Sequence, residues 1–426
     1  MPLYEIISKS PLIPWRFRNA FENWVENTAH NKHPSLYRYL HFGQKADPIR
    51  RITSGPKHHF YGYYEKSPWD KSQQYIAAHQ VEFNDRPPIE DDRAEVGIID
   101  LQRDNSFIPI GNTRTWNFQQ GAMLQWHPTK DDCLFFNSID QDSFISILVN
   151  TNGREIKRFS RPIYAISPTG ETAYSLNYSR LATHRPGYGY CGSIDEFKDE
   201  YAPKLDGIWK IDLTNDTSDL IITLAQLVDI SPKDSMKDAH HWINHIQINP
   251  SGNRIAFFHL WRYGETGWRG RLYTADQDGS NLKLILDNDV ISHYDWLDDE
   301  SILIWANNKN SKPYFLLCDI TSVDEKIIGD GVLVEDGHCS FSPNRAWVLN
   351  DTYPDRFDMR TLMLYNLNEN HRIDIARLFS PKDKWWGEIR CDLHPRWNRI
   401  GNEICIDSVH DGTRQMYIAD ISNYLR

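Results

Sequence analysis

One short motif recurs along the chain, and a repeat of this kind constrains the fold more than any other feature of the sequence. Each copy opens with an aromatic or apolar residue. In most copies Ser, Asn or His and then Pro follow, before a polar turn and an apolar strand. The seven copies begin at Tyr63, Leu124, Tyr164, Ile246, Tyr294, Cys339 and Cys391. Because one such unit cannot bury its apolar faces alone, we expect the copies to pack side by side.

Most copies continue into a further strand that ends in a short acidic turn, as in VGIIDL near Asp100 and GIWKIDL near Asp212. Copies are mostly about 40 to 60 residues apart, which is enough for four short strands each. The 15 Trp, 21 Tyr and 18 Phe suit many aromatic-rich strands. The sequence therefore predicts an all-β fold, a seven-bladed β-propeller.

The repeat also suggests the domain organisation. Residues 1–50 stand outside it, and residues 51–426 are assigned to the propeller. Within the first part, a proline start is followed by aromatic residues at helical spacing, Phe17, Phe21 and Trp24. This pattern predicts a short N-terminal helical appendage that packs against the propeller.

The third and fourth copies are separated by a longer gap, which contains an insertion at residues 182–207. It is rich in Gly, Tyr and charged residues, so we expect a long loop on one face of the propeller. Propellers commonly carry function on such loops, although a surface excursion without function fits the sequence equally well.

Charge and hydropathy limit the classes of partner that the protein can bind. The formal net charge is −11 and no basic run is present, so a nucleic-acid backbone would be repelled. An acidic sugar remains compatible, because a few Arg or His residues can set the potential of one cleft. We find no apolar segment of secretory or membrane-spanning length. We therefore expect a cytoplasmic protein without nucleic-acid or membrane partners.

Four consecutive copies place a basic side chain five residues before the Pro-like position. In HIQINP, HYDWLD, HCSFSP and RCDLHP these are His245, His293, His338 and Arg390. The innermost strands of a propeller run side by side around the axis, so these side chains should converge. Neutral imidazoles suit Mn²⁺ or Zn²⁺, which makes a divalent transition metal the expected cofactor. The alternative is that each His hydrogen-bonds the backbone of the next blade.

A second cluster surrounds the third copy and the insertion, and comprises Tyr164, Tyr178, Arg180, His184 and Arg185. A phenol and a guanidinium together suit a reaction in which a proton leaves the carbon beside a carboxylate. The Arg neutralises the carboxylate, while a Tyr or His exchanges the proton. Structural Tyr and Arg residues within a blade would produce the same pattern.

Further residues are candidates for substrate binding: His59, Gln120, Arg262, Trp268 and Arg390. Trp and Arg side chains can stack on each other and clamp an acidic sugar, although interblade packing would use the same residue types. The sequence has no GxSxG, GxxxxGK[ST], GxGxxG or HExxH motif. Serine-hydrolase, nucleotide-binding and zincin chemistries therefore lack support.

Three segments, NHIQINPSGNRIAFFHLWR, ISHYDW and DGHCSFSPNRAWVLND, resemble the oligogalacturonate lyases. These are cytoplasmic seven-bladed propellers that cleave short uronate chains by β-elimination, with a His base and a Mn²⁺-type ion. The resemblance implies that His245 is the base and that His293 and His338 are metal ligands. The pair Tyr164 and Arg180 is similar in type and spacing to the Tyr/Arg pair of the ulvan lyases, propellers that act on uronate-containing polysaccharides.

The residues and the resemblance together predict a carbon–oxygen lyase that cleaves a uronic-acid-containing oligosaccharide or polysaccharide by β-elimination. Its expected catalytic residues are His245, Tyr164 and Arg180, with Arg185 among those that bind the substrate. Two other functions stay open. One is a non-catalytic propeller that binds a glycan or a protein. The other is a glycoside hydrolase, which would need paired carboxylates in the same pocket.

Overall fold

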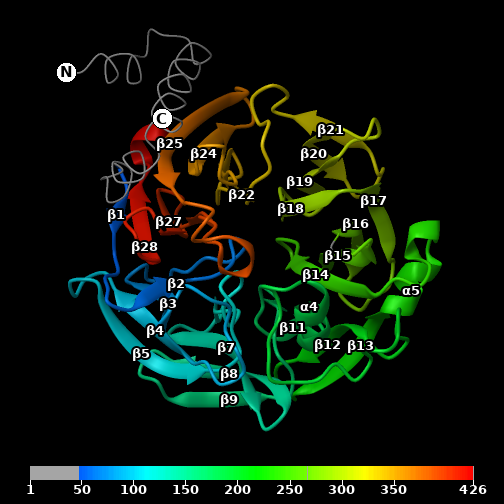
Figure 1. Cartoon of the computed structure of the whole chain (residues 1–426), viewed down its shortest axis with the longest axis horizontal. Helices are drawn as coiled ribbons and strands as arrows, with labels where there is room; N and C mark the ends of the chain where they lie inside the picture. Colours follow the sequence, from blue (N-terminus) through cyan, green and yellow to red (C-terminus); the bar gives the residue numbers. More distant parts are fainter. Residues whose placement is uncertain (1–47, 266, 426) are drawn as a thin grey trace.

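The computed structural model describes residues 48–265 and 267–425. They form seven four-stranded antiparallel sheets arranged as blades around a central axis (Figure 1). The predicted seven-bladed β-propeller is confirmed. The predicted helical appendage lies outside the described residues. The predicted boundary after residue 50 falls inside β1 (Arg50–Arg51), the first described strand.

Each blade takes four strands in chain order, with one exception. Blade one comprises β2 (His58–Phe60), β3 (Tyr75–Val81), β4 (Ala94–Asp100) and β5 (Ser106–Thr113). Blade two comprises β6 (Gln125–Trp126), β7 (Cys133–Asp140), β8 (Ser143–Asn150) and β9 (Glu155–Phe159). Blade three comprises β10 (Ala165–Ile166), β11 (Thr172–Ser175), β12 (Gly207–Asp212) and β13 (Thr217–Thr223).

The next three blades follow the same order. Blade four comprises β14 (His241–Ile248), β15 (Arg254–Tyr263), β16 (Gly267–Asp276) and β17 (Lys283–Asp289). Blade five comprises β18 (Ile291–Trp296), β19 (Ser301–Asn307), β20 (Pro313–Asp319) and β21 (Glu325–Ile328). Blade six comprises β22 (Ser340–Phe341), β23 (Trp347–Asp351), β24 (Met359–Asn366) and β25 (His371–Phe379).

Blade seven closes the ring by combining the two ends of the described chain. Its strands β26 (Arg396–Trp397), β27 (Glu403–Ser408) and β28 (Gln415–Asp420) are completed by β1, which pairs with β28 in the antiparallel sense (Figure 1). Because the outermost strand comes from the beginning of the propeller, the ring is held closed by ordinary sheet hydrogen bonds.

Few helices accompany the strands. The described ones are α4 (Tyr178–His184), α5 (Leu224–Asp229) and the 3₁₀ turns η1 (Asp234–Met236), η2 (Gly387–Ile389) and η3 (Ser422–Tyr424). The predicted insertion begins within α4 and connects β11 to β12 in blade three. Within the described part of the chain, no helix combines the length and hydropathy needed to cross a membrane.

The apolar strands arise because every blade is covered on both faces by its neighbours. In β19, Ile302 and Ile304 join the core shared with blade four, whereas Leu303 and Trp305 join the core shared with blade six. Successive side chains of a strand point to opposite faces, so a nearly continuous apolar run divides between two cores. This packing explains why the repeat motif is apolar rather than alternating.

The first turn of each blade connects its first two strands and fixes their register. Its first residue donates its backbone N–H to the carbonyl of a residue that lies four to six positions further along the chain. These residues are Asp70, His127, Ser167, Asn249, Leu297, Ser342 and Asn398. In blade seven the turn therefore begins at Asn398, not at the His394-Pro395 pair that the sequence motif indicated.

The correction in blade seven has a local cause. The Asn398 side chain accepts hydrogen bonds from the backbone N–H groups of Gly401, Asn402 and Glu403, and so builds the turn. The preceding Pro395 lies immediately before the innermost strand β26, outside the turn. Blade one behaves similarly, since its Ser67-Pro68 pair precedes the actual turn at Asp70.

Candidate functional site

The corrected register places a histidine four residues before the turn in four consecutive blades. These residues are His245, His293, His338 and His394, while Arg390 lies four positions out of register. Consecutive rings are close, with centroid separations of 5.9, 3.9 and 4.3 Å along the series. The imidazoles therefore form a continuous arc beside the propeller axis, from blade four to blade seven.

A tyrosine from blade one closes this arc. The ring of Tyr63 lies 5.1 Å from that of His394 and 5.2 Å from that of His245, measured between centroids. Its hydroxyl contacts Nε2 of His245. The Tyr63 carbonyl accepts a hydrogen bond from Nε of Arg396, which is ion-paired with Asp407 at 2.8 Å. Sequence reasoning missed Tyr63 as a site residue, although it lies five residues before Pro68, the spacing that identified the histidines in later copies.

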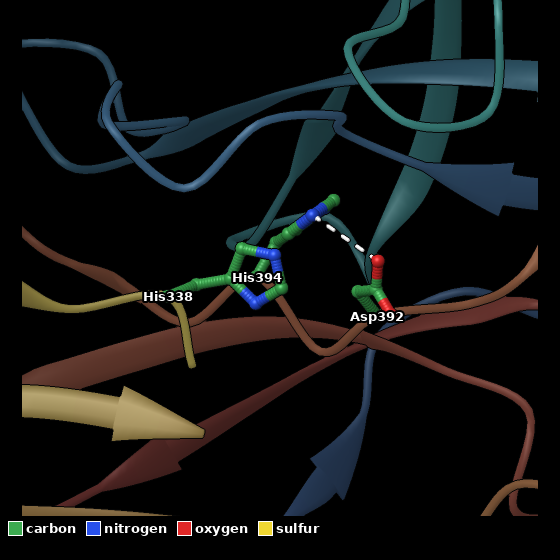
Figure 2. Close-up of side chains that lie close together, drawn as sticks. All are labelled: His338, Asp392 and His394. Carbon is green, nitrogen blue, oxygen red and sulfur yellow. Dashed lines mark ion pairs between the residues drawn. The ribbon is translucent and has the colours of Figure 1, made fainter. Parts of the chain in front are cut away.

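His338, Asp392 and His394 bring ligand atoms within 4.8 Å of one another. Figure 2 shows the two imidazoles side by side and the carboxylate facing His394. Nε2 of His394 lies 3.9 Å from Oδ2 of Asp392. Among the described residues, this is the set of His, Cys and carboxylate groups that fits one metal ion. The sequence predicted His338 as a ligand but missed His394 and Asp392, because His394 was assigned to a turn.

The hydrogen bonding of His338 prepares it to bind a cation. Its Nδ1 lies 2.8 Å from Oδ1 of Asp351, and both side chains are buried. Although burial opposes ionisation of Asp351, the contacts from His338 lower the pKa of this carboxyl below its usual value. The carboxylate therefore accepts the Nδ1 proton, which leaves the lone pair on Nε2. Among the described residues, Nε2 of His338 and Nε2 of His394 are buried without hydrogen-bond partners, as expected of metal ligands.

Asp392 is less free than the two imidazoles. Nε of Arg390 lies 2.6 Å from its Oδ2, and Nη2 of Arg360 lies 2.7 Å from its Oδ1. Burial opposes ionisation, but these two guanidiniums hold the pKa of Asp392 well below its usual value. The imidazoles are therefore the main candidate metal ligands, and Asp392 connects them to Arg390 through its ion pair. Imidazole with carboxylate is a donor set that suits Mn²⁺ or Zn²⁺.

A cavity of about 430 Å³ adjoins the arc, and His245 and His293 form part of its wall. This volume is within the usual range for small-molecule sites. The wall is otherwise rich in aromatic and charged side chains. These side chains include Arg185, Tyr188, Trp268, Tyr353, Trp386 and Arg390.

Arg185 is an unpaired cation in this cavity. It follows α4 directly, and its guanidinium stacks 3.7 Å above the ring of Trp268 and 5.2 Å from that of Tyr188. Within the described residues its guanidinium has no hydrogen bond or ion pair. Burial lowers the pKa of Arg185, and the charge of Arg390 acts in the same direction. A partly desolvated guanidinium without a counter-ion favours an anionic ligand.

His245 owes its position to an irregularity in β14. The pairing of β14 with β15 shifts between Asn244 and Gln247, and His245 adopts a φ of 56° at this bulge. Bulges re-aim a side chain, and this one places the imidazole at the cavity wall. Nδ1 of His245 is buried and has no hydrogen-bond partner in the described part of the chain. Burial lowers the pKa of His245 well below its usual value, with further contributions from His293 and Arg185, so the imidazole is neutral near neutral pH.

Comparison with known proteins supports the fold. No family model and no curated protein matches the sequence. An oligogalacturonate lyase solved in complex with manganese has a TM-score of 0.63 at 13% identity, covering 87% of this chain and 92% of its own. The oligogalacturonate lyase from Vibrio parahaemolyticus has a TM-score of 0.62 at 11% identity, covering 89% and 94%. The chain has the fold of the oligogalacturonate lyases.

The resemblance predicted from the blade motifs is thus confirmed for the fold. Identities this low establish architecture, and the roles of individual residues are argued from the geometry alone. Of the residues that the resemblance singled out, His245 and His293 line the cavity, and His338 belongs to the metal-type group beside it.

Tyr164 and Gln120 support His245 from behind the cavity. The Tyr164 hydroxyl accepts hydrogen bonds from Nε2 of Gln120 at 2.8 Å and from the backbone N–H of His245 at 3.1 Å, and it donates to Oδ1 of Asn244 at 3.2 Å. Burial raises the pKa of Tyr164 well above its usual value, so it stays protonated. The structure therefore places both residues where they fix the bulge of β14, not on the cavity wall.

Arg180 is occupied by the insertion rather than directed at the cavity. It is 1% exposed and forms an ion pair with Asp195, with Nη1 3.1 Å from Oδ2. Its remaining N–H groups donate to backbone carbonyls, including those of Phe197 at 3.0 Å, Glu200 at 2.8 Å and Tyr201 at 2.9 Å. The predicted catalytic role is therefore not supported by its placement, because no donor is left for a substrate carboxylate.

Two other predicted binding residues also lie off the cavity wall. Both ring nitrogens of His59 are engaged, by Gln415 at 3.0 Å and Gln80 at 2.8 Å, and burial lowers its pKa to about 4. Arg262 donates from Nη2 to the carbonyl of His184 at 2.8 Å. By contrast, Arg185, Trp268 and Arg390 all line the cavity as predicted substrate-binding residues would.

The role of Asp351 leads to a prediction. Asp351→Asn should weaken Mn²⁺ binding by about 10- to 100-fold, because the amide no longer fixes the lone pair of His338 on Nε2. Isothermal titration of the metal-free protein with Mn²⁺ measures this change. Asp140→Asn, an exposed carboxylate paired with Arg158, is the matched control and should leave the affinity unchanged. Equal Mn²⁺ affinity in wild type and Asp351→Asn would contradict the assignment.

Proposed function

We propose that the protein is a carbon–oxygen lyase that cleaves a uronic-acid-containing oligosaccharide or polysaccharide by β-elimination. The observation that carries this proposal is a single cavity whose wall holds both the unpaired guanidinium of Arg185 and the neutral imidazole of His245. One of these groups suits a carboxylate and the other a proton on the neighbouring carbon. The shared fold with two solved oligogalacturonate lyases supports the same chemistry.

The reaction follows from these two groups. Arg185 pairs with the uronate carboxylate and so acidifies the adjacent C–H bond. His245 accepts that proton at Nδ1, its nitrogen without a protein partner, and the electron pair of the C–H bond forms the new C=C bond. The C–O bond to the leaving sugar breaks, and its oxygen takes a proton from a hydroxyl of the cavity. Tyr188 and Tyr353 both line the cavity and are the candidates for that donor.

Binding of the carboxylate would also improve the base. Arg185 is one of the charges that lower the pKa of His245. When a uronate carboxylate neutralises Arg185, this contribution falls away and the pKa of His245 rises toward its usual range. Because the pKa of His245 is low in the free protein, the imidazole is unprotonated when the substrate arrives, and it becomes a stronger base only after the carboxylate has bound.

A divalent ion of the manganese type fits the adjoining group. His338 and His394 would hold it through their Nε2 atoms together with a carboxylate oxygen of Asp392, and the ring of His293 lies beside that of His338. When bound, the ion would supply positive charge close to the substrate carboxylate. The manganese complex of one solved oligogalacturonate lyase supports this choice of metal.

The test is to incubate the purified protein with a panel of uronic-acid oligosaccharides and to follow the ultraviolet absorbance of an unsaturated uronate. We expect a rise that a chelator abolishes and added Mn²⁺ restores. New reducing ends without this absorbance would show hydrolysis and contradict the proposal. Oligosaccharide binding without any product would instead favour a non-catalytic propeller.

A further inference from the structure

Exposed apolar side chains gather at the mouth of the cavity. Trp268, Val290 and Trp386 are 39%, 49% and 56% exposed, and all three belong to the cavity wall. Single exposed apolar residues are ordinary on a protein surface, whereas several around one cavity mark a ligand-binding surface. The chemistry proposed above does not use these side chains.

Trp386 is an exposed indole on a well-anchored segment. It lies between β25 and β26, immediately before η2. The preceding Trp385 is fully buried and packs with Cys391 and Val409. Within the described residues, the Trp386 indole has no ring, cation or hydrogen-bond partner. A large aromatic surface is thus held in place at the cavity with nothing covering it.

Further contacts fix the segment that carries Trp386. Nη1 of Arg390 donates to the carbonyl of Gly387 at 3.0 Å, and Nε2 of Gln119 donates to the carbonyl of Arg390 at 2.9 Å. Since Trp386 directly precedes Gly387, these hydrogen bonds also restrain its backbone. A preorganised platform loses little conformational entropy when a ligand binds.

Trp268 stands on blade four. It is the second residue of β16, and one face of its indole carries the Arg185 guanidinium. Trp268 comes from blade four, whereas Trp386 comes from the connection between blades six and seven. The anion-binding cation of the cavity therefore lies against one indole, and the second indole belongs to another part of the ring.

We propose that Trp386 is a sugar-stacking platform for the chain residue next to the uronate held by Arg185. The inference rests on the proposed function for the acidic sugar, and it adds a separate binding surface for the neighbouring residue of the chain. The C–H face of a pyranose ring is apolar and covers an indole well, while the uronate carboxylate requires Arg185. Trp268 serves mainly to hold Arg185 in position.

The test separates chain binding from catalysis by using the His245→Ala background, in which substrate is bound but not cleaved. Isothermal titration with galacturonic acid and with its linear trimer gives two affinities. Adding Trp386→Ala should weaken trimer binding about tenfold and change monomer binding by less than about twofold. Ile400→Ala, which removes a 66% exposed apolar side chain outside the cavity wall, is the matched control and should change neither affinity.

The outcomes distinguish this inference from the function on which it rests. An equal loss of monomer and trimer affinity, or no loss of either, would overturn the platform. Failure of both sugars to bind the His245→Ala protein would overturn it as well. Trp386→Ala could weaken trimer binding selectively while the wild-type protein produces no unsaturated uronate. That result would support the platform and contradict the lyase proposal.

Discussion

Replacing His245 with alanine should lower kcat for uronate elimination by about a thousandfold, within the range that a general base contributes. His245 is the imidazole that lines the cavity with an unpartnered Nδ1, and the bulge of β14 places it there. Burial lowers the pKa of His245 well below its usual value in the free enzyme, so kcat/KM should persist into mildly acidic pH. The bound carboxylate raises this pKa, so kcat should begin to fall at a higher pH than kcat/KM does. Steady-state absorbance assays across pH measure both effects.

Two controls show whether the loss belongs to the base. His371→Ala, at an exposed histidine of β25, should retain the wild-type rate. The His245→Ala protein itself should bind Mn²⁺ as tightly as wild type, because His245 is not part of the His338, Asp392 and His394 group. A His245→Ala enzyme with wild-type kcat would refute the assignment, and one that has lost Mn²⁺ binding would move its role to the metal.

Arg180→Ala should lower the free energy of unfolding by about 3–5 kcal/mol. The substitution leaves the carboxylate of Asp195, only 4% exposed as a side chain, without its ion-pair partner. It also removes the donors to several backbone carbonyls of the insertion. Urea unfolding followed by fluorescence measures the difference in midpoint and slope.

The matched control is a surface arginine with similar partners. Arg158 pairs with Asp140 and Glu155, but its side chain is 46% exposed, so Arg158→Ala should change stability by no more than about 1 kcal/mol. If Arg180→Ala were as stable as Arg158→Ala but inactive, Arg180 would have to act on the substrate after all. That result would restore the catalytic role predicted from the sequence.

The blades could be predicted because their signal is local. A strand buried between two neighbouring blades must be apolar on both sides, and the turn that follows it needs Pro, Asn, Asp or Gly, so each copy leaves a recognisable pattern. The same regularity identified His245, His293 and His338, since equivalent positions of a repeat meet at the axis. The insertion was recognisable by its length and composition, and it supplies Arg185 to the cavity.

The errors arose where the local signal was ambiguous. In blade seven, a His-Pro pair resembles the turn of other blades but lies immediately before the innermost strand, so His394 was assigned to the turn and Arg390 was aligned in its place. Arg180 carried the residue type expected of a carboxylate-binding group. Its actual partner, Asp195, lies in the insertion at residues 182–207, and no periodicity in the sequence predicts the path of that insertion.

The sequence by itself determined the number of blades, the closeness of three histidines at the axis and the segment that forms part of the cavity, because each of these depends on repetition or composition. The tertiary structure alone decided which side chains are free to act. It showed that Arg180 is neutralised by Asp195 whereas Arg185 is not, and that Nε2 of His338 is left open. A side chain's availability depends on every hydrogen bond and charge around it, and those neighbours come from distant parts of the chain.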